Sequence, residues 1–254
     1  MNRKELESYK GITGFSLGQI EKDYFQHIIL SALSREAAGL LVFKGGTALQ
    51  KTGITHRFSE DLDFTKKNHI DIKKIKDVVI TSIKKYHYPI DYDNVHKDNL
   101  SDSFRIKIQG PLFTNKRGIC TIRIEISKRE TVELPLQKKE FSPLYTDILP
   151  YLLYIMSNEE MIAEKIRTIY TRNKSRDLYD LYYLLKQQTN IDINLINKKL
   201  DYYNLTFEKQ AFLQKCNALE KNWENELNSL IKGHIPFQTV FSSIQQAIQQ
   251  QNLG

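Results

Sequence analysis

Residues 41–64 restrict the possible folds of this chain more than any other stretch. They read LVFKGGTAL and, after a short gap, RFSEDLDF. The apolar residues at Leu40–Phe43 predict a short strand, the two glycines predict a tight turn, and the residues after them predict a helix that ends near Gly53. A second strand is predicted at Asp61–Thr65. This order of elements favours a domain in which helices pack against a sheet.

Two aspartates occupy alternate positions of the second predicted strand. Side chains alternate between the faces of a strand, so Asp61 and Asp63 share one face while Leu62 and Phe64 point to the core. Two close carboxylates are costly without a cation, and the turn at Gly45–Thr47 offers N–H groups suited to phosphate. A tight turn or a solvated surface explains each feature alone. Their combination predicts a site for phosphoryl or nucleotidyl transfer.

The remainder of the N-terminal half alternates helix and strand signals. Apolar residues recur at helical spacing over residues 1–38 and Ile70–Tyr86. Strand alternation follows at Phe104–Ile108 and Ile122–Ile126, and the turn residues between them predict a hairpin.

Glu125 lies on the polar face of the last of these strands. If that strand adjoins the strand of Asp61 and Asp63, Glu125 becomes a third carboxylate of the site. The alternative is an exposed residue or a salt bridge to a neighbour such as Arg123.

A change of pattern between Pro135 and Pro150 predicts a domain boundary. Strand signals stop there, and helical periodicity continues from a capping box at Ser157–Glu160 to the C-terminus. We therefore predict one domain at residues 1–140 and a helical domain at residues 141–254.

The helical half carries a second group of charged residues. Lys165 and Arg167 lie on a helix that is otherwise apolar, and Asp177 and Asp180 share one face of the next helix. Acids in a first turn complement the helix dipole and can pair with either base. A lysine near a carboxylate–metal cluster can instead bind phosphate and stabilise charge during transfer.

Three polar residues flank the first motif, and each has two interpretations. Lys44, Arg57 and Ser59 can all contact phosphate. Equally, Ser59 can serve the turn, and Arg57 can pair with Asp61 or Asp63.

The overall charge favours a polyanionic partner. The 254-residue chain has a formal net charge of +7, and no apolar run has the length of a membrane span, so we expect a cytoplasmic protein without membrane contact. A basic stretch with nearby tyrosines suggests either a solvated helix face or a track for RNA. Its lysines are Lys66, Lys67, Lys73, Lys74, Lys76, Lys84 and Lys85.

Four segments together resemble the AbiEii/AbiGii toxin family of DNA polymerase β-like nucleotidyltransferases. They are FKGGTAL at 43–49, RFSEDLDF at 57–64, MIAEKIR at 161–167 and RDLYDLY at 176–182. The resemblance implies an α+β fold, with a nucleotidyltransferase-like mixed sheet and flanking helices followed by a C-terminal helical lobe. It also implies a toxin of a toxin–antitoxin or phage-abortive system.

The same resemblance implies roles for the candidate residues. Asp61, Asp63, Lys165, Asp177 and Asp180 are the expected catalytic residues, with the choice between Asp177 and Asp180 open. The expected ligands of Mg²⁺ or Mn²⁺ are Asp61, Asp63 and, by analogy with the superfamily, Glu125. The residues expected at the NTP are Lys44, Gly45, Gly46, Thr47, Arg57, Ser59 and Lys165.

The resulting hypothesis is transfer of NMP from an NTP to RNA. The related MenT toxins add nucleotides to tRNA 3′ ends, which makes tRNA the expected acceptor and a cognate antitoxin the expected protein partner. Two alternatives stay open at this stage. One is transfer to a protein or small molecule, and the other is a non-catalytic module that binds nucleotide or antitoxin.

Overall fold

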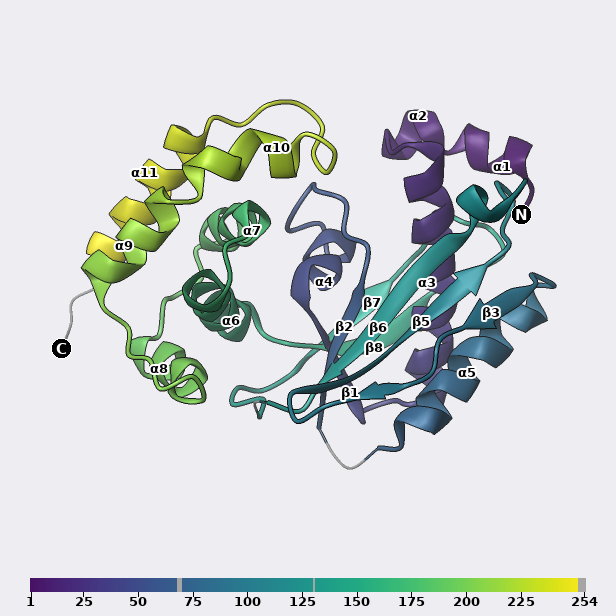
Figure 1. The fold of residues 1–254 in the computed structure, drawn as a ribbon, viewed down its shortest axis with the longest axis horizontal. Coiled ribbons are helices and arrows are strands. Elements are labelled where there is room, and N and C mark those ends of the chain that lie inside the picture. Colours follow the sequence, from purple (N-terminus) through teal and green to yellow (C-terminus); the bar gives the residue numbers. More distant parts are fainter. Residues whose placement is uncertain (68–69, 130, 251–254) are drawn as a thin grey trace. The chain divides into compact units, whose positions relative to one another are not determined.

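The computed structural model of the protein describes residues 1–67, 70–129 and 131–250 (Figure 1). The chain packs as two compact units, each discontinuous in sequence. The sheet unit comprises Met1–Ala48, Glu60–Thr131 and Leu136–Ile155. The helical unit comprises Leu49–Ser59, Val132–Pro135 and the chain from Met156 onward.

The described residues of the sheet unit form an eight-stranded mixed sheet. Its order is β3-β5-β6-β2-β1-β8-β7, with β4 paired to β5. β1 runs antiparallel to β2 and parallel to β8, and β2 runs parallel to β6. The bounds are β1 Leu41–Lys44, β2 Leu62–Lys66, β3 Ile90–Tyr92, β4 His96–Lys97, β5 Ser101–Ile108, β6 Cys120–Ser127, β7 Gln137–Phe141 and β8 Tyr151–Ile155.

The alternating residues of β5 and β6 explain why these strands pair in one register. Phe104 lies opposite Ile124 and Ile106 opposite Ile122, and all four side chains are buried. A shift of one residue would turn this apolar set to the other face, so burial specifies the register. The predicted hairpin is confirmed.

Helices of the sheet unit bury their apolar sides in the same core as the strands. These helices are α1 Arg3–Ser8, α3 Leu17–Glu36, α4 Gly45–Lys51 and α5 Ile72–Lys85, with α4 continuing into the helical unit. The short helix α2 Lys10–Thr13 has no buried residue and connects α1 to α3. α3 begins at a capping box of Ser16 and Gln19, and Asp71 caps α5. α3 and α5 lie side by side (Figure 1).

The prediction that strands stop between Pro135 and Pro150 was wrong. β7 lies within that stretch and β8 follows it, and the compact sheet unit extends past residue 140 to Ile155. β7 reads QKKEF, and its three middle residues are exposed because it is an edge strand. Such a polar segment has no apolar alternation from which a strand is recognised.

The helical unit matches the predicted helical segments closely. Its helices are α6 Asn158–Thr171, α7 Ser175–Leu185, α8 Ile193–Asp201, α9 Lys209–Asn217, α10 Trp223–Leu227 and α11 Phe237–Gln249. Ser157 caps α6, but the predicted capping box is only half formed. The Glu160 carboxylate instead accepts from the N–H groups of Glu133 and Leu134 and pairs with Lys199 at 2.5 Å.

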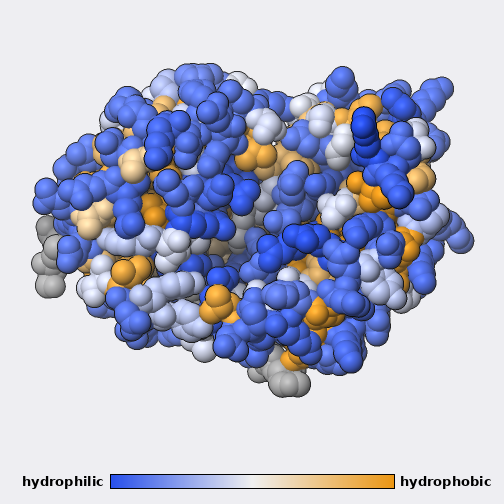
Figure 2. Space-filling model, in the orientation of Figure 1, coloured by the Kyte–Doolittle hydropathy of each residue, from blue (hydrophilic) through white to orange (hydrophobic). Residues whose placement is uncertain are grey.

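The predicted α+β fold, a mixed sheet with flanking helices and a helical C-terminal part, is confirmed. Hydrophilic residues dominate the face shown in Figure 2, and hydrophobic ones are scattered over it in small groups. Within the described residues, no helix combines the length and the apolar character needed to cross a membrane.

Candidate active site

The turn between β1 and α4 requires glycine at position 45 for two reasons. Gly45 has φ +76°, a conformation that side chains with a Cβ rarely adopt. A Cβ at this position would lie 2.7 Å from Oδ2 of Asp63 and 3.1 Å from its Cβ. The glycine therefore lets the Asp63 side chain lie directly against the backbone of the turn.

Thr47 and Lys44 complete the packing of this motif. Thr47 is fully buried and its hydroxyl donates to the backbone carbonyl of Asp61. Lys44, the last residue of β1, is opposite Asp63 in the antiparallel pair with β2. The motif residues thus hold one another in place, and the hydroxyl of Thr47 acts on the backbone that carries Asp61.

A row of polar residues runs across four neighbouring strands of the sheet, on the face turned away from the hydrophobic core of the sheet unit. Lys44 pairs in register with Asp63, Asp63 with Glu125, and Glu125 with Ser103. The strand of Glu125 therefore adjoins the aspartate strand, as the third-carboxylate hypothesis requires. Asp61 immediately precedes β2, two positions before Asp63.

Glu125 also has the salt-bridge partners that the alternative interpretation predicted. Its carboxylate lies 2.7 Å from Nη2 of Arg123 and 3.5 Å from Nη2 of Arg129. Within residues 1–67, 70–129 and 131–250, no three His, Cys, Asp or Glu side chains form a group that could hold a metal ion. The three acids expected as metal ligands are therefore not gathered as a three-ligand site.

The helical unit contains a buried ion network centred on Asp180. The Asp180 carboxylate binds Arg57 through two hydrogen bonds of 2.6 Å, from Nε and Nη2. Nζ of Lys165 lies 2.7 Å from Oδ2 of the same group. Such a bidentate pair fixes the guanidinium in both distance and plane. Arg57 therefore pairs with Asp180, rather than with Asp61 or Asp63.

Asp177 extends the network by one step. Its carboxylate lies 3.0 Å from Nζ of Lys165 and accepts two hydrogen bonds, of 2.7 and 2.8 Å, from Arg172. The side chains of Asp177 and Asp180 are fully buried, whereas Arg172 is 46% exposed. Lys165 thus contacts both aspartates, and its contacts do not distinguish Asp177 from Asp180 as the functional acid.

The surrounding cations keep both acids ionised. Burial would raise the pKa of Asp177, but Lys165 and Arg172 outweigh it and lower that pKa below its usual value. For Asp180, burial again acts to raise the pKa, and Arg57 and Lys165 lower it overall. Burial would lower the pKa of Arg57, whereas Asp180 raises it.

The predicted site residues thus fall into two groups. The sheet unit carries Lys44, Gly45, Gly46, Thr47, Asp61, Asp63 and Glu125, and the helical unit carries Arg57, Ser59, Lys165, Asp177 and Asp180. The backbone N–H of Ser59 donates to Oε1 of Gln50 at 2.8 Å. The segment at 57–59 is therefore anchored within the helical unit, immediately before the chain reaches Asp61.

Sequence reasoning missed Arg172. It follows α6 in the short polar break before α7, and a polar break is expected there whatever its function. Its distance of five residues from Asp177 matches no helical pairing rule. No signal in the sequence pointed to its role.

Comparison with known proteins gives one family and several similar folds. The family described as "Nucleotidyl transferase AbiEii toxin, Type IV TA system" matches residues 28–249. The structure of JHP933 from Helicobacter pylori is 20% identical and has a TM-score of 0.62, with 92% of each chain covered. MenT4, a nucleotidyltransferase toxin of Mycobacterium tuberculosis, is 18% identical with a TM-score of 0.62, and covers 100% of this chain and 91% of its own. No curated protein matches the chain significantly.

Proposed function

Because the chain belongs to the family of AbiEii nucleotidyl transferase toxins, we propose that it transfers a nucleoside monophosphate from an NTP to RNA. The observation that carries this proposal is the packing of Asp63 against the Gly45 turn. It brings the Asp63 carboxylate into direct contact with the backbone of a glycine turn, where no side chain lies between them. We further propose the 3′ end of tRNA as the acceptor and a cognate antitoxin as the protein partner.

Asp61 and Asp63 form a donor set that fits Mg²⁺ or Mn²⁺. Mg²⁺ prefers oxygen ligands and is commonly held by one or two carboxylates, while substrate phosphates and water complete the shell. Two aspartates therefore suffice, and Glu125, which pairs with Arg123 and Arg129, is not needed. When bound, the cation neutralises charge on the triphosphate and on the departing pyrophosphate.

We assign the triphosphate to the turn at Gly45–Thr47, with Lys44 of the same unit as a cationic contact. For the helical unit, we propose Lys165 as a phosphate ligand in its own right. An ammonium group has three N–H donors. Among residues 1–67, 70–129 and 131–250, Asp177 and Asp180 are the acids that contact Nζ of Lys165, which leaves its third N–H to a phosphate oxygen. Asp177 and Asp180 then act as positioning residues that orient Lys165.

Charge on the polar face of the sheet supports a polyanionic acceptor. Arg105 of β5 lies directly opposite Arg123 of β6, two positions along from the pair of Ser103 and Glu125. Glu125 compensates the charge of Arg123, so Arg105 is the cation of this pair that we assign to an RNA phosphate. In the reaction, a terminal hydroxyl of the RNA attacks the α-phosphorus of the NTP and pyrophosphate leaves.

The test is incubation of the purified protein with labelled NTPs and total tRNA. Asp63→Asn should abolish RNA labelling, because it removes one of the two acids assigned to the cation. Asp91→Asn, which changes an exposed aspartate on β3 of the same sheet, should label RNA as the wild type does. Equal labelling by Asp63→Asn and the wild type would refute the proposed site.

Two digestions identify the acceptor. Loss of the labelled product with nuclease but not with protease supports RNA. Loss with protease alone would instead show a protein acceptor. Binding of NTP and Mg²⁺ in calorimetry, without any labelled product, would leave only a nucleotide-binding module.

A further inference from the structure

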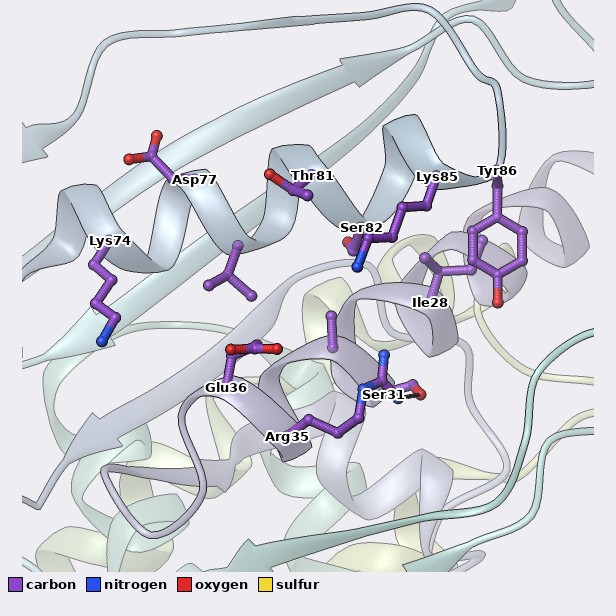
Figure 3. A pocket seen from close by; sticks show the side chains of 12 residues that line it. Ile28, Ser31, Arg35, Glu36, Lys74, Asp77, Thr81, Ser82, Lys85 and Tyr86 are labelled. Atoms are coloured by element: carbon purple, nitrogen blue, oxygen red, sulfur yellow. Dashed lines mark hydrogen bonds between the residues drawn. The ribbon is translucent and has the colours of Figure 1, made fainter.

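A cavity of about 340 Å³ lies between α3 and α5 in the sheet unit (Figure 3). Its walls are two stripes of residues at helical spacing, one from each helix. From α3 it is lined by Ile28, Ser31, Ala32, Arg35 and Glu36, and from α5 and the residue after it by Lys74, Asp77, Val78, Thr81, Ser82, Lys85 and Tyr86. None of these residues belongs to the candidate active site.

Small side chains explain why the two helices leave a space here. Packed helices normally interdigitate large apolar side chains along their facing ridges. Ser31, Ala32 and Ser82 are buried at this interface and fill little volume. The resulting cavity falls in the size range of small-molecule sites, and Ile28, Ala32 and Val78 give it an apolar wall.

Two cations face each other across one end of this cavity. The Lys85 side chain points from α5 toward α3, where the guanidinium of Arg35 lies (Figure 3). Arg35 donates to Oγ of Ser31 at 2.8 Å, and neither cation forms an ion pair with an acid in the described part of the chain. Both residues are exposed, so water screens their mutual repulsion, and an anion between them would be attracted by both.

Tyr86 places a hydroxyl at the same end. Burial and Asp147 raise the pKa of the Tyr86 phenol, and Arg35 opposes that rise. The phenol is therefore close enough to the Arg35 guanidinium to be affected by its charge. The Tyr86 hydroxyl donates to the backbone carbonyl of Asp147 at 3.1 Å and its oxygen can still accept. This end of the cavity is therefore electropositive and polar, next to an apolar wall.

We propose that this cavity binds a small organic anion with an apolar body. The anionic head would lie between Arg35 and Lys85, and the body would pack against Ala32 and Val78. Glu36 and Asp77 line the cavity as well, so a second anionic group on the ligand would meet acidic side chains. The site therefore selects a monoanion over a dianion of the same length.

This site does not depend on the proposed nucleotidyl transfer, although the fold connects the two. α3 leads through a short loop to β1 and the Gly45 turn, and α5 follows β2, which carries Asp63. A ligand that holds α3 against α5 would brace the two helices attached to the motif strands.

The first experiment compares two fluorescent probes on the full chain. 8-Anilinonaphthalene-1-sulfonate is an apolar monoanion, and N-phenyl-1-naphthylamine is its uncharged analogue. We expect one molecule of the anionic probe to bind per chain, at least about fivefold more tightly than the neutral probe. Equal binding of both probes, or binding of neither, would overturn the proposal.

Variants then locate the site. Lys85→Gln and Arg35→Gln should each weaken the anionic probe about three- to tenfold. Lys84→Gln is the matched control, because Lys84 is the exposed neighbour on the same helix and does not line the cavity. Ala32→Met should fill the cavity and displace the probe without removing a charge. If all four variants bind the probe equally, the cavity is not the site.

Competition tests the ligand class. Octanoate should displace the bound probe, whereas octanedioate, which has the same length and a second carboxylate, should not. Equal displacement by both acids would contradict the assigned role of Glu36 and Asp77.

Discussion

Replacing Gly45 with alanine tests the geometry of the candidate site in one step. Its positive φ alone costs a non-glycine residue about 1–2 kcal/mol. The new Cβ would also lie 2.7, 3.1 and 3.3 Å from Oδ2, Cβ and Cγ of Asp63. Three atoms of one short side chain cannot all give way by a rotation at its tip, and overpacking of this kind costs about 1–3 kcal/mol more. We expect Gly45→Ala to lose about 2–5 kcal/mol of stability and to move the Asp63 carboxylate.

Gly53→Ala is the matched control for this substitution. Gly53 has φ +73°, nearly that of Gly45, but a Cβ there would have no atom within 4 Å. It pays the backbone cost of about 1–2 kcal/mol without touching an aspartate. Chemical denaturation measures the stability of each variant, and RNA labelling well below the melting temperature measures activity.

The two variants should separate stability from activity. Gly53→Ala should keep wild-type labelling in spite of its lower stability, whereas Gly45→Ala should lose labelling while still folded. Wild-type labelling by a folded Gly45→Ala would refute the argument that the turn positions Asp63. Equal losses in both variants would mean that strain, rather than the contact, is responsible.

Three further predictions concern the charged residues. Asp180→Asn should lower the free energy of unfolding by about 3–5 kcal/mol in urea denaturation, because it leaves Arg57 and Lys165 without their shared anion; an unchanged midpoint would contradict a buried network. The lowered pKa values of Asp177 and Asp180 mean that their contribution to stability is complete above the ordinary aspartate pKa of about 3.9, and is lost as the pH falls below it. Thermal melts should therefore show no effect of this network between pH 7 and 5, and a smaller acid-induced loss in the Asp180→Asn variant. Arg105→Gln should reduce the salt dependence of RNA binding by about one phosphate contact, whereas Lys97→Gln on β4 should not.

The parts of the fold that follow from local periodicity could be predicted from the sequence. The isoleucines of β6 and the facing residues of β5 alternate with a period of two, and burial of one face leaves a single register. The aspartate strand was predictable for the same reason, since Leu62 and Phe64 alternate with the acids and are buried. The pairing of β2 with β6 brings Glu125 beside Asp63. From the sequence, this neighbourhood followed only if the two strands were assumed to adjoin.

The contacts that join distant segments could not be predicted. Arg57 and Asp180 are separated by 123 residues, and no spacing rule connects them. Proximity in sequence instead suggested Asp61 or Asp63 as the partner of Arg57. The i, i+3 spacing of Asp177 and Asp180 did predict a shared helical face, but not that Lys165 lies between both carboxylates. Edge strand β7 was missed because its exposed residues are polar.

The charge balance of the buried network bears directly on the role of Lys165. Arg57, Lys165 and Arg172 provide three positive charges against two carboxylates, which leaves one in excess. Arg172 is the half-exposed member, so water can solvate that excess charge. The fully buried part, two cations and two anions, is neutral and needs no further anion for stability. The proposed contact of Lys165 with a phosphate therefore depends on its third N–H group and not on uncompensated charge, and Asp177 and Asp180 determine where that group points.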